Sequence, residues 1–225
     1  MHRLAPLWIL LFLILAAALP LLFGSLMIAG LEKLHLGGGA ALLIVLGIIF
    51  GSMINIPVRR IAREDELTVA PFAVFGLPQA MPQLGRRVRE TVIAVNLGGC
   101  LIPTGLAVYE FLVLLRETPG LLPALGVAVA LNVFACYRLA QPIPGLGIAI
   151  PALAPALVAA MAALIMVPGA APPVAFIAGV VGPLIGADLL HLRDVEKAAA
   201  GILSIGGAGT FDGIVLSGIV AAYLA

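Results

Sequence analysis

The sequence has very little charge. Only 10% of its 225 residues are Asp, Glu, Lys or Arg, whereas 63% are hydrophobic and the mean hydropathy is +1.21. Ordinary soluble domains carry about 25% charged residues, so the polar surface is too small to cover this chain in water. The formal net charge of +1 also argues against the clustered basic face that nucleic-acid binding needs. We predict a polytopic membrane protein whose exterior contacts the lipid bilayer.

Cysteine is almost absent as well. Cys100 and Cys136 both lie in apolar stretches, where a free thiol behaves as a small hydrophobic side chain. Two such residues cannot build a disulfide framework. A disulfide-stapled fold is therefore excluded, and the thiols say little about the compartment.

Long apolar runs take the place of the missing charge. They cover residues 6–31, 40–57, 91–115, 120–140, 147–167, 171–190 and 198–225. A membrane span needs about 20 apolar residues, so each of the first six can cross a bilayer, and the first is too long for a signal-peptide core. We predict an all-α membrane protein: a polytopic helical bundle with six or seven hydrophobic segments, in which residues 1–225 form a single integral membrane domain.

One long polar connection, residues 58–90, separates these runs. Six arginines bracket it: Arg59, Arg60, Arg63, Arg86, Arg87 and Arg89. The positive-inside rule places this loop, and with alternating spans the N-terminus, in the cytoplasm. Residues 67–75 are rich in β-formers and precede Gly76-Leu77-Pro78, which predicts a short β-hairpin-like loop. Topology and contact with lipid headgroups explain the arginines better than substrate binding does.

The last fifty residues do not form two ordinary spans. Each glycine in Gly206-Gly207-Ala208-Gly209 costs a helix about 1 kcal/mol relative to alanine. Unwound backbone at membrane depth has to be buried in protein or line a cavity. We therefore expect a broken C-terminal segment, with Thr210 as the N-cap of a terminal helix and Asp212 in its first turn.

Ionisable side chains beside this break are the candidate functional residues. Asp188 and His191 are spaced i, i+3, so on a helix their Cβ atoms lie about 5–6 Å apart on one face. If the broken segment folds back, Asp212 joins them, and carboxylates with an imidazole suit zinc, iron or manganese. The predicted site is a divalent metal ion, with zinc the best fit, held by Asp188, His191 and Asp212, with Asn96 as a further ligand or the partner of a bound water.

The same residues have structural explanations. Asp188 could pair with Arg193 at the interfacial end of its helix, and Asp212 could serve only as an anion at a helix N-terminus. Asn96, beside a glycine pair, could make an interhelical hydrogen bond. These alternatives compete with the metal site.

Two further ionisable residues are best explained without a catalytic role. Glu110 is the third acid inside an apolar run and lies near Arg116 at the outer end of that run, which predicts an ion pair or an interface position. His35 precedes Gly37-Gly38-Gly39, which predicts a loop residue on the non-cytoplasmic side.

Five motifs carry a resemblance to a known family. They are Asn55-Ile56-Pro57, Asn96-Leu97-Gly98-Gly99-Cys100-Leu101-Ile102-Pro103, Gln141-Pro142-Ile143-Pro144-Gly145-Leu146-Gly147-Ile148, Gly186-Ala187-Asp188-Leu189-Leu190-His191 and Ser204-Ile205-Gly206-Gly207-Ala208-Gly209-Thr210-Phe211-Asp212-Gly213. Over residues 40–225 the chain resembles a family of small prokaryotic membrane proteins of unknown function. The resemblance implies the inner (plasma) membrane, a metalloenzyme-like fold and a homodimer, and it adds weight to Asp188, Asp212 and Asn96.

Three classes of function fit these observations. In a membrane-embedded metal-dependent hydrolase, the leading interpretation, the metal acidifies a bound water and Asp188 and Asp212 are catalytic. In an intramembrane aspartyl protease, Asp188 and Asp212 share one proton and activate water directly, although their flanking residues only partly match the Gly-x-Gly-Asp pattern of presenilin-like proteases. In an ion or small-solute transporter, the unwound backbone would bind an ion, but no inverted repeat is evident.

Overall fold

Helices dominate the structure, as the composition predicts. The computed structural model describes residues 21–37, 39–65, 87–143, 147–151, 153–193 and 201–225. Within these ranges the α-helices are Leu21–Leu31, α2 (Ala40–Gly51), α3 (Ile102–Glu117), α4 (Leu122–Leu139), α5 (Ala154–Met166), α6 (Ala171–Val181) and α8 (Gly213–Leu224). Short π-helical segments, Leu97–Leu101 and Gly182–Leu189, precede α3 and follow α6.

Three of these helical stretches are long and apolar enough to cross a membrane. They are Leu97–Glu117, Pro119–Leu139 and Pro168–Leu189, and the other four apolar helices of the described ranges have only 10–17 residues. Large side chains on their outer faces are exposed, among them Phe134 at 65% and Ile165 at 76%. Such faces are consistent with contact to a lipid bilayer. The prediction of six or seven hydrophobic segments is thus confirmed only in part, because full spanning length is shown for three.

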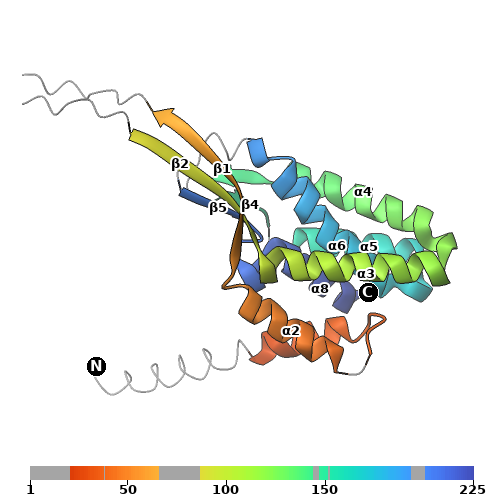
Figure 1. The fold of residues 1–225 in the computed structure, drawn as a ribbon. Helices are drawn as coiled ribbons and strands as arrows, with labels where there is room; N and C mark the ends of the chain where they lie inside the picture. Colours follow the sequence, from red (N-terminus) through yellow and green to blue (C-terminus); the bar gives the residue numbers. More distant parts are fainter. Residues whose placement is uncertain (1–20, 38, 66–86, 144–146, 152, 194–200) are drawn as a thin grey trace, which may run out of the picture.

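Helix α6 forms the centre of the bundle. Its residues from Pro173 to Val180 are all buried, with α3, α4, α5 and α8 packed around it (Figure 1). The backbones of α6 and α8 meet closely, because a Cβ added to Gly179 would stand 2.6 Å from the Ser217 carbonyl oxygen. Small residues allow this approach between membrane helices. The tight α6–α8 crossing joins the helix that precedes the segment carrying Asp188 to the helix that Asp212 caps.

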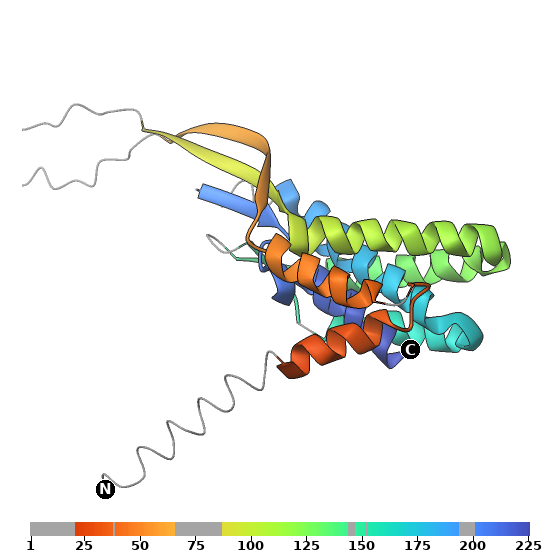
Figure 2. The same ribbon diagram turned by 60° about the horizontal axis from the view of Figure 1, so that its bottom comes forward.

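A small sheet projects from one end of the bundle, which the sequence did not predict. Strands β1 (Asn55–Asp65) and β2 (Arg87–Asn96) are antiparallel, and β5 (Gly201–Ile205) pairs in parallel with β2. The order is β1-β2-β5, and the β1–β2 pair extends beyond the helices (Figures 1 and 2). A separate two-stranded ribbon joins β3 (Gln141–Ile143) to β4 (Gly147–Ala149).

The sheet corrects two predicted segments. The apolar run 40–57 leaves its helix after Gly51 and enters β1, and the run 91–115 begins in β2 before it becomes helical. A short apolar run rich in Val, Ile and Thr is compatible with a strand or a buried helix, and here pairing with distant segments selects the strand. The ends of the predicted polar loop 58–90 therefore belong to β1 and β2, while the hairpin signal at 67–78 lies outside the described residues.

The predicted C-terminal break is confirmed in a modified form. After β5, the chain turns at Gly206 with φ +72° and at Gly209 with φ +60°, a backbone conformation that favours glycine. A 3₁₀ turn, Gly209–Phe211, then leads into α8. Thr210 lies inside this turn and is not the N-cap as predicted, because the Asp212 carboxylate caps α8 instead.

Candidate functional site

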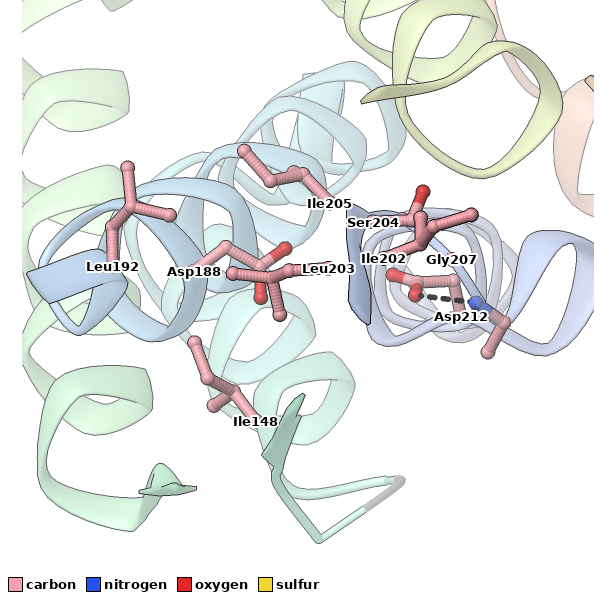
Figure 3. Close-up of a pocket in the computed structure, with 11 residues that line it drawn as sticks. Ile148, Asp188, Leu192, Ile202, Leu203, Ser204, Ile205, Gly207 and Asp212 are labelled. Carbon is pink, nitrogen blue, oxygen red and sulfur yellow. Dashed lines mark hydrogen bonds between the residues drawn. The ribbon is translucent and has the colours of Figure 1, made fainter. Parts of the chain in front are cut away.

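Asp188 and Asp212 line the same cavity at the sheet end of the bundle. The cavity has a volume of ≈ 260 Å³ and is called the acid cavity below. Its walls are formed by Ile148, Asp188, Leu192, Ile202, Leu203, Ser204, Ile205, Gly206, Gly207, Ala208 and Asp212 (Figure 3). The structure therefore brings together two of the four predicted site residues. Asp188 precedes the glycine-rich turn in the sequence, and Asp212 follows it.

The π-helical segment that follows α6 presents Asp188. This residue is the seventh of the eight in Gly182–Leu189, and segments with π-helical geometry are frequent at functional sites. The backbone N–H of Gly206 lies near the Asp188 carboxylate. Gly186, two residues earlier, allows close packing because a Cβ there would contact the carbonyl oxygen of Val133 on α4. Asp188 is thus held between the helical bundle and the glycine-rich turn.

Asp212 enters the cavity from the start of α8. Its Oδ1 accepts the backbone N–H of Ile214 at 3.0 Å, and its Oδ2 accepts that of Ala208 at 3.4 Å. Burial raises the pKa of the Asp212 carboxyl above its ordinary value, and these two backbone donors offset part of that rise. The carboxylate thus both caps the helix and keeps its polar atoms at the cavity.

The two carboxylates line one cavity, and the negative charge of Asp212 acts on the Asp188 carboxyl. Within the described ranges neither has a lysine or arginine nitrogen within 4.0 Å, so the predicted ion pair between Asp188 and Arg193 is not formed. Two neighbouring acids without a basic partner bind a proton or a cation more readily than isolated acids do. This pair has the electrostatic character of a functional site.

A polar network behind the cavity holds the glycine-rich turn in place. Asn96 is fully buried and accepts the backbone N–H of Gly99 at 2.7 Å, while its Nδ2 donates to the Ser52 carbonyl oxygen and to Asn55 Oδ1. The Ser204 hydroxyl also donates to Asn55 Oδ1, at 2.6 Å. Asn96 therefore lies behind the wall of the acid cavity and organises its neighbours. The predicted contact of Asn96 with a metal or water stays a prediction.

Close backbone packing fixes the same turn. A Cβ added to Gly99 would contact the Gly206 carbonyl oxygen, and one added to Gly209 would stand 2.6 Å from Ser52 Oγ. The Ser52 hydroxyl lies 3.1 Å from Thr210 Oγ1. Sequence reasoning did not identify Ser52 or Ser204 as part of the site. The signal that could have found Ser204 is its place at the start of the most specific motif, directly before the glycines.

His191 lies beside the cavity with its ring directed elsewhere. Its Nδ1 is 3.0 Å from the Ala187 carbonyl oxygen and 3.2 Å from that of Gly186, and its ring packs against Tyr137 with centroids 4.9 Å apart. Across the described part of the chain, no group of three or more His, Cys, Asp or Glu side chains is placed to hold a metal ion. Binding of one cation by Asp188, His191 and Asp212 stays a prediction.

Comparison with known proteins gives one match. A family model described as "Protein of unknown function (DUF1614)" matches residues 49–224, which include all four predicted site residues. No curated protein and no solved structure matches the chain.

Proposed function

Because the chain belongs to that family of unknown function, we propose its activity from the site itself: hydrolysis of a peptide bond by Asp188 and Asp212, as in an intramembrane aspartyl protease. The observation that carries the proposal is the shared cavity, into which two interacting carboxylates project with backbone N–H groups as their partners. The position of the His191 ring against Tyr137 favours this two-acid mechanism over a three-ligand metal site.

The chemistry requires one protonated and one ionised carboxyl. Two close carboxylates do not readily ionise together, so the pair retains one proton. The ionised member removes a proton from water, and the water oxygen bonds to the peptide carbonyl carbon. The protonated member then gives its proton to the departing nitrogen as the C–N bond breaks. One water is consumed, and the products are a carboxyl terminus and an amine.

We place the acid cavity at the cytoplasmic side of a multi-pass inner-membrane protein. The cavity and the sheet lie at the same end of the bundle (Figure 1). Strands β1 and β2 at that end contain Arg59, Arg60, Arg63, Arg87 and Arg89, which supports a cytoplasmic position by the positive-inside rule. A reporter fused within residues 76–80 should therefore be cytoplasmic, and a periplasmic signal would overturn this orientation.

A direct test uses the full chain, purified in mild detergent, with a panel of quenched fluorescent single-span peptides. In isotopically labelled water, each new carboxyl terminus should gain one labelled oxygen by mass spectrometry. Asp188→Asn and Asp212→Asn should each slow cleavage by roughly 10²–10⁴-fold, the range for loss of acid–base catalysis. Ser25→Ala, an exposed change outside the cavity, serves as the matched control and should cleave normally.

Three results would overturn the proposal. The first is undiminished cleavage by both asparagine variants. The second is no cleavage of any peptide by the wild-type protein. The third is loss of cleavage on chelation with recovery on zinc, which would support the metal-dependent hydrolase instead.

A further inference from the structure

The strand beside the acids has an open edge. In the described residues, β5 lies last in the order β1-β2-β5 and pairs only with β2, from Thr91↔Gly201 to Val95↔Ile205. Its other edge therefore presents backbone N–H and C=O groups away from the sheet. Ile202 on this strand is 75% exposed. Exposed strand edges of this kind readily accept another strand.

This edge borders the acid cavity. Leu203 and Ile205 alternate with Ile202 and Ser204 along β5, and all four line the cavity, so both faces of the strand contribute. Figure 3 shows Leu203 on the side of Asp188, whereas Ser204 lies on the side of Asp212. A cavity that includes both faces of a strand has to pass around its edge. The carboxylates thus line the same cavity as the edge that an added strand would follow.

The opposite wall of the cavity also carries a strand. Ile148 belongs to β4, whose partner in the described part of the chain is β3. In Figure 3, Ile148 approaches the cavity from the side away from Ser204 and Ile205. An extended segment placed along β5 would therefore be enclosed between two strands, with apolar side chains on both walls.

We propose that the substrate binds as an added strand: an extended, apolar polypeptide segment pairs with the open edge of β5, and its scissile bond lies beside the pair formed by Asp188 and Asp212. This inference rests on the proposed function for its chemistry, but strand pairing itself requires no catalysis. Main-chain hydrogen bonds supply affinity in such complexes, and pockets for alternate side chains supply specificity. The substrate class is a membrane-proximal segment rich in β-branched residues, because these favour the extended conformation.

Disulfide capture tests this pairing without hydrolysis. The protein is the full-length Asp188→Asn/Asp212→Asn variant carrying Ile202→Cys, with the buried native cysteines retained. The probe is a peptide of about ten residues, the upper length of an ordinary strand, with alternating valine and threonine and one cysteine moved through every position. Ile165→Cys on α5 is the matched control, because Ile165 is 76% exposed and lies outside the acid cavity.

Capture by Ile202→Cys should be about tenfold faster than by Ile165→Cys, which corresponds to about 1.4 kcal/mol. Its rate should alternate with the position of the peptide cysteine, because every second side chain of a strand faces the same side. Leu203→Cys should show the same alternation shifted by one peptide position. N-methylation of alternate peptide residues removes main-chain donors and should reduce capture to the control rate.

Each failure has a distinct meaning. Capture without alternation, capture equal to that of Ile165→Cys, or capture that is insensitive to N-methylation would overturn the strand-pairing inference, even if the wild-type protein cleaves peptides. Alternating capture by a protein that cleaves no peptide would overturn the proposed function and leave the docking edge in place. Thermal unfolding of both cysteine variants establishes that each is folded.

Discussion

Three acidic side chains lie in apolar parts of this chain, and their surroundings in the structure differ. Glu110 on α3 is 0% exposed, and its carboxylate lies 2.9 Å from His35 Nδ1 and accepts the His35 backbone N–H at 3.1 Å. Asp188 and Asp212 face a cavity and each other, with backbone donors as partners. A fully partnered acid joins two parts of the fold, whereas acids that face a cavity remain able to act on a bound molecule.

The partner of Glu110 shows what the structural role is. His35 lies in the connection between Leu21–Leu31 and α2, and its carbonyl oxygen accepts the Tyr109 hydroxyl at 2.8 Å. Three hydrogen bonds therefore attach this connection to α3. The sequence predicted an ion pair for Glu110 but placed it near Arg116. No equivalent attachment involves the Asp188 or Asp212 side chains and a basic residue in the described ranges.

The largest expected effect is on activity, and it distinguishes Asp188 and Asp212 from Glu110. Asp188→Asn and Asp212→Asn should reduce peptide cleavage by roughly 10²–10⁴-fold while the protein stays folded. Asparagine is as good an N-cap as aspartate, so α8 should keep its cap. Replacing one of two acids that do not readily ionise together should leave stability equal or higher. Cleavage rates and thermal unfolding measure both quantities. Unfolding of both variants would assign these acids the same structural role as Glu110.

Glu110→Ala should show the opposite pattern. It removes both acceptors of His35 and leaves a space in α3. Because the His35 side chain is 44% exposed, the cost should be roughly 1–3 kcal/mol, the range for removing the hydrogen-bond partner of another group. The free energy of unfolding in detergent should fall by about that amount, while cleavage per folded molecule stays unchanged. His35→Ala removes the imidazole but keeps the backbone N–H that donates to Glu110, and it should also lower stability without changing cleavage per folded molecule. If Glu110→Ala lost cleavage without losing stability, Glu110 would no longer differ in role from Asp188 and Asp212.

The turn that carries Asp212 should respond to a single methyl group. Gly99→Ala brings a Cβ against the Gly206 carbonyl oxygen, and such overpacking costs roughly 1–3 kcal/mol. Cleavage should fall with stability because the turn moves relative to Asp188. Gly105→Ala on α3 is the matched control, since nothing lies within 4 Å of its added Cβ, and it should be neutral or stabilise by up to about 1 kcal/mol. Equal effects of the two changes would show that the turn is not held by this contact.

The smallest expected effect concerns pH. Because burial raises the pKa of Asp212, its protonated form should persist to higher pH than that of an ordinary carboxyl. Cleavage needs one protonated acid, so the rate should decline as pH rises through this raised pKa, above the usual carboxyl range. The pH profile of kcat/KM checks this sign. A basic limb within the ordinary carboxyl range would contradict the requirement for a protonated acid with a raised pKa.

The β-structure shows where sequence reasoning reached its limit. The strand signal at 67–75 was local, but the observed strands β1 and β2 flank that segment, and β5 comes from more than one hundred residues later. The apolar pattern of 91–96 suits a helix as well as a strand, and only pairing with β1 and β5 selects the strand. The periodicity of one segment does not reveal which distant segment will pair with it through backbone hydrogen bonds.

The chain itself determined its apolar character, the break at the glycines and the identity of the acids, because these depend on local chemistry: too few charges, too little helix propensity and ionisable groups in apolar runs. Tertiary structure alone decided which acid of the described residues has a basic side-chain partner. The His35 imidazole contacts Glu110, the His191 ring contacts the Ala187 carbonyl oxygen, and Asp188 lines the same cavity as Asp212. The physical reason is that a side chain's partner comes from whichever distant segment packs against it, and the close glycine contacts between α6 and α8 and between Gly99 and Gly206 set that packing.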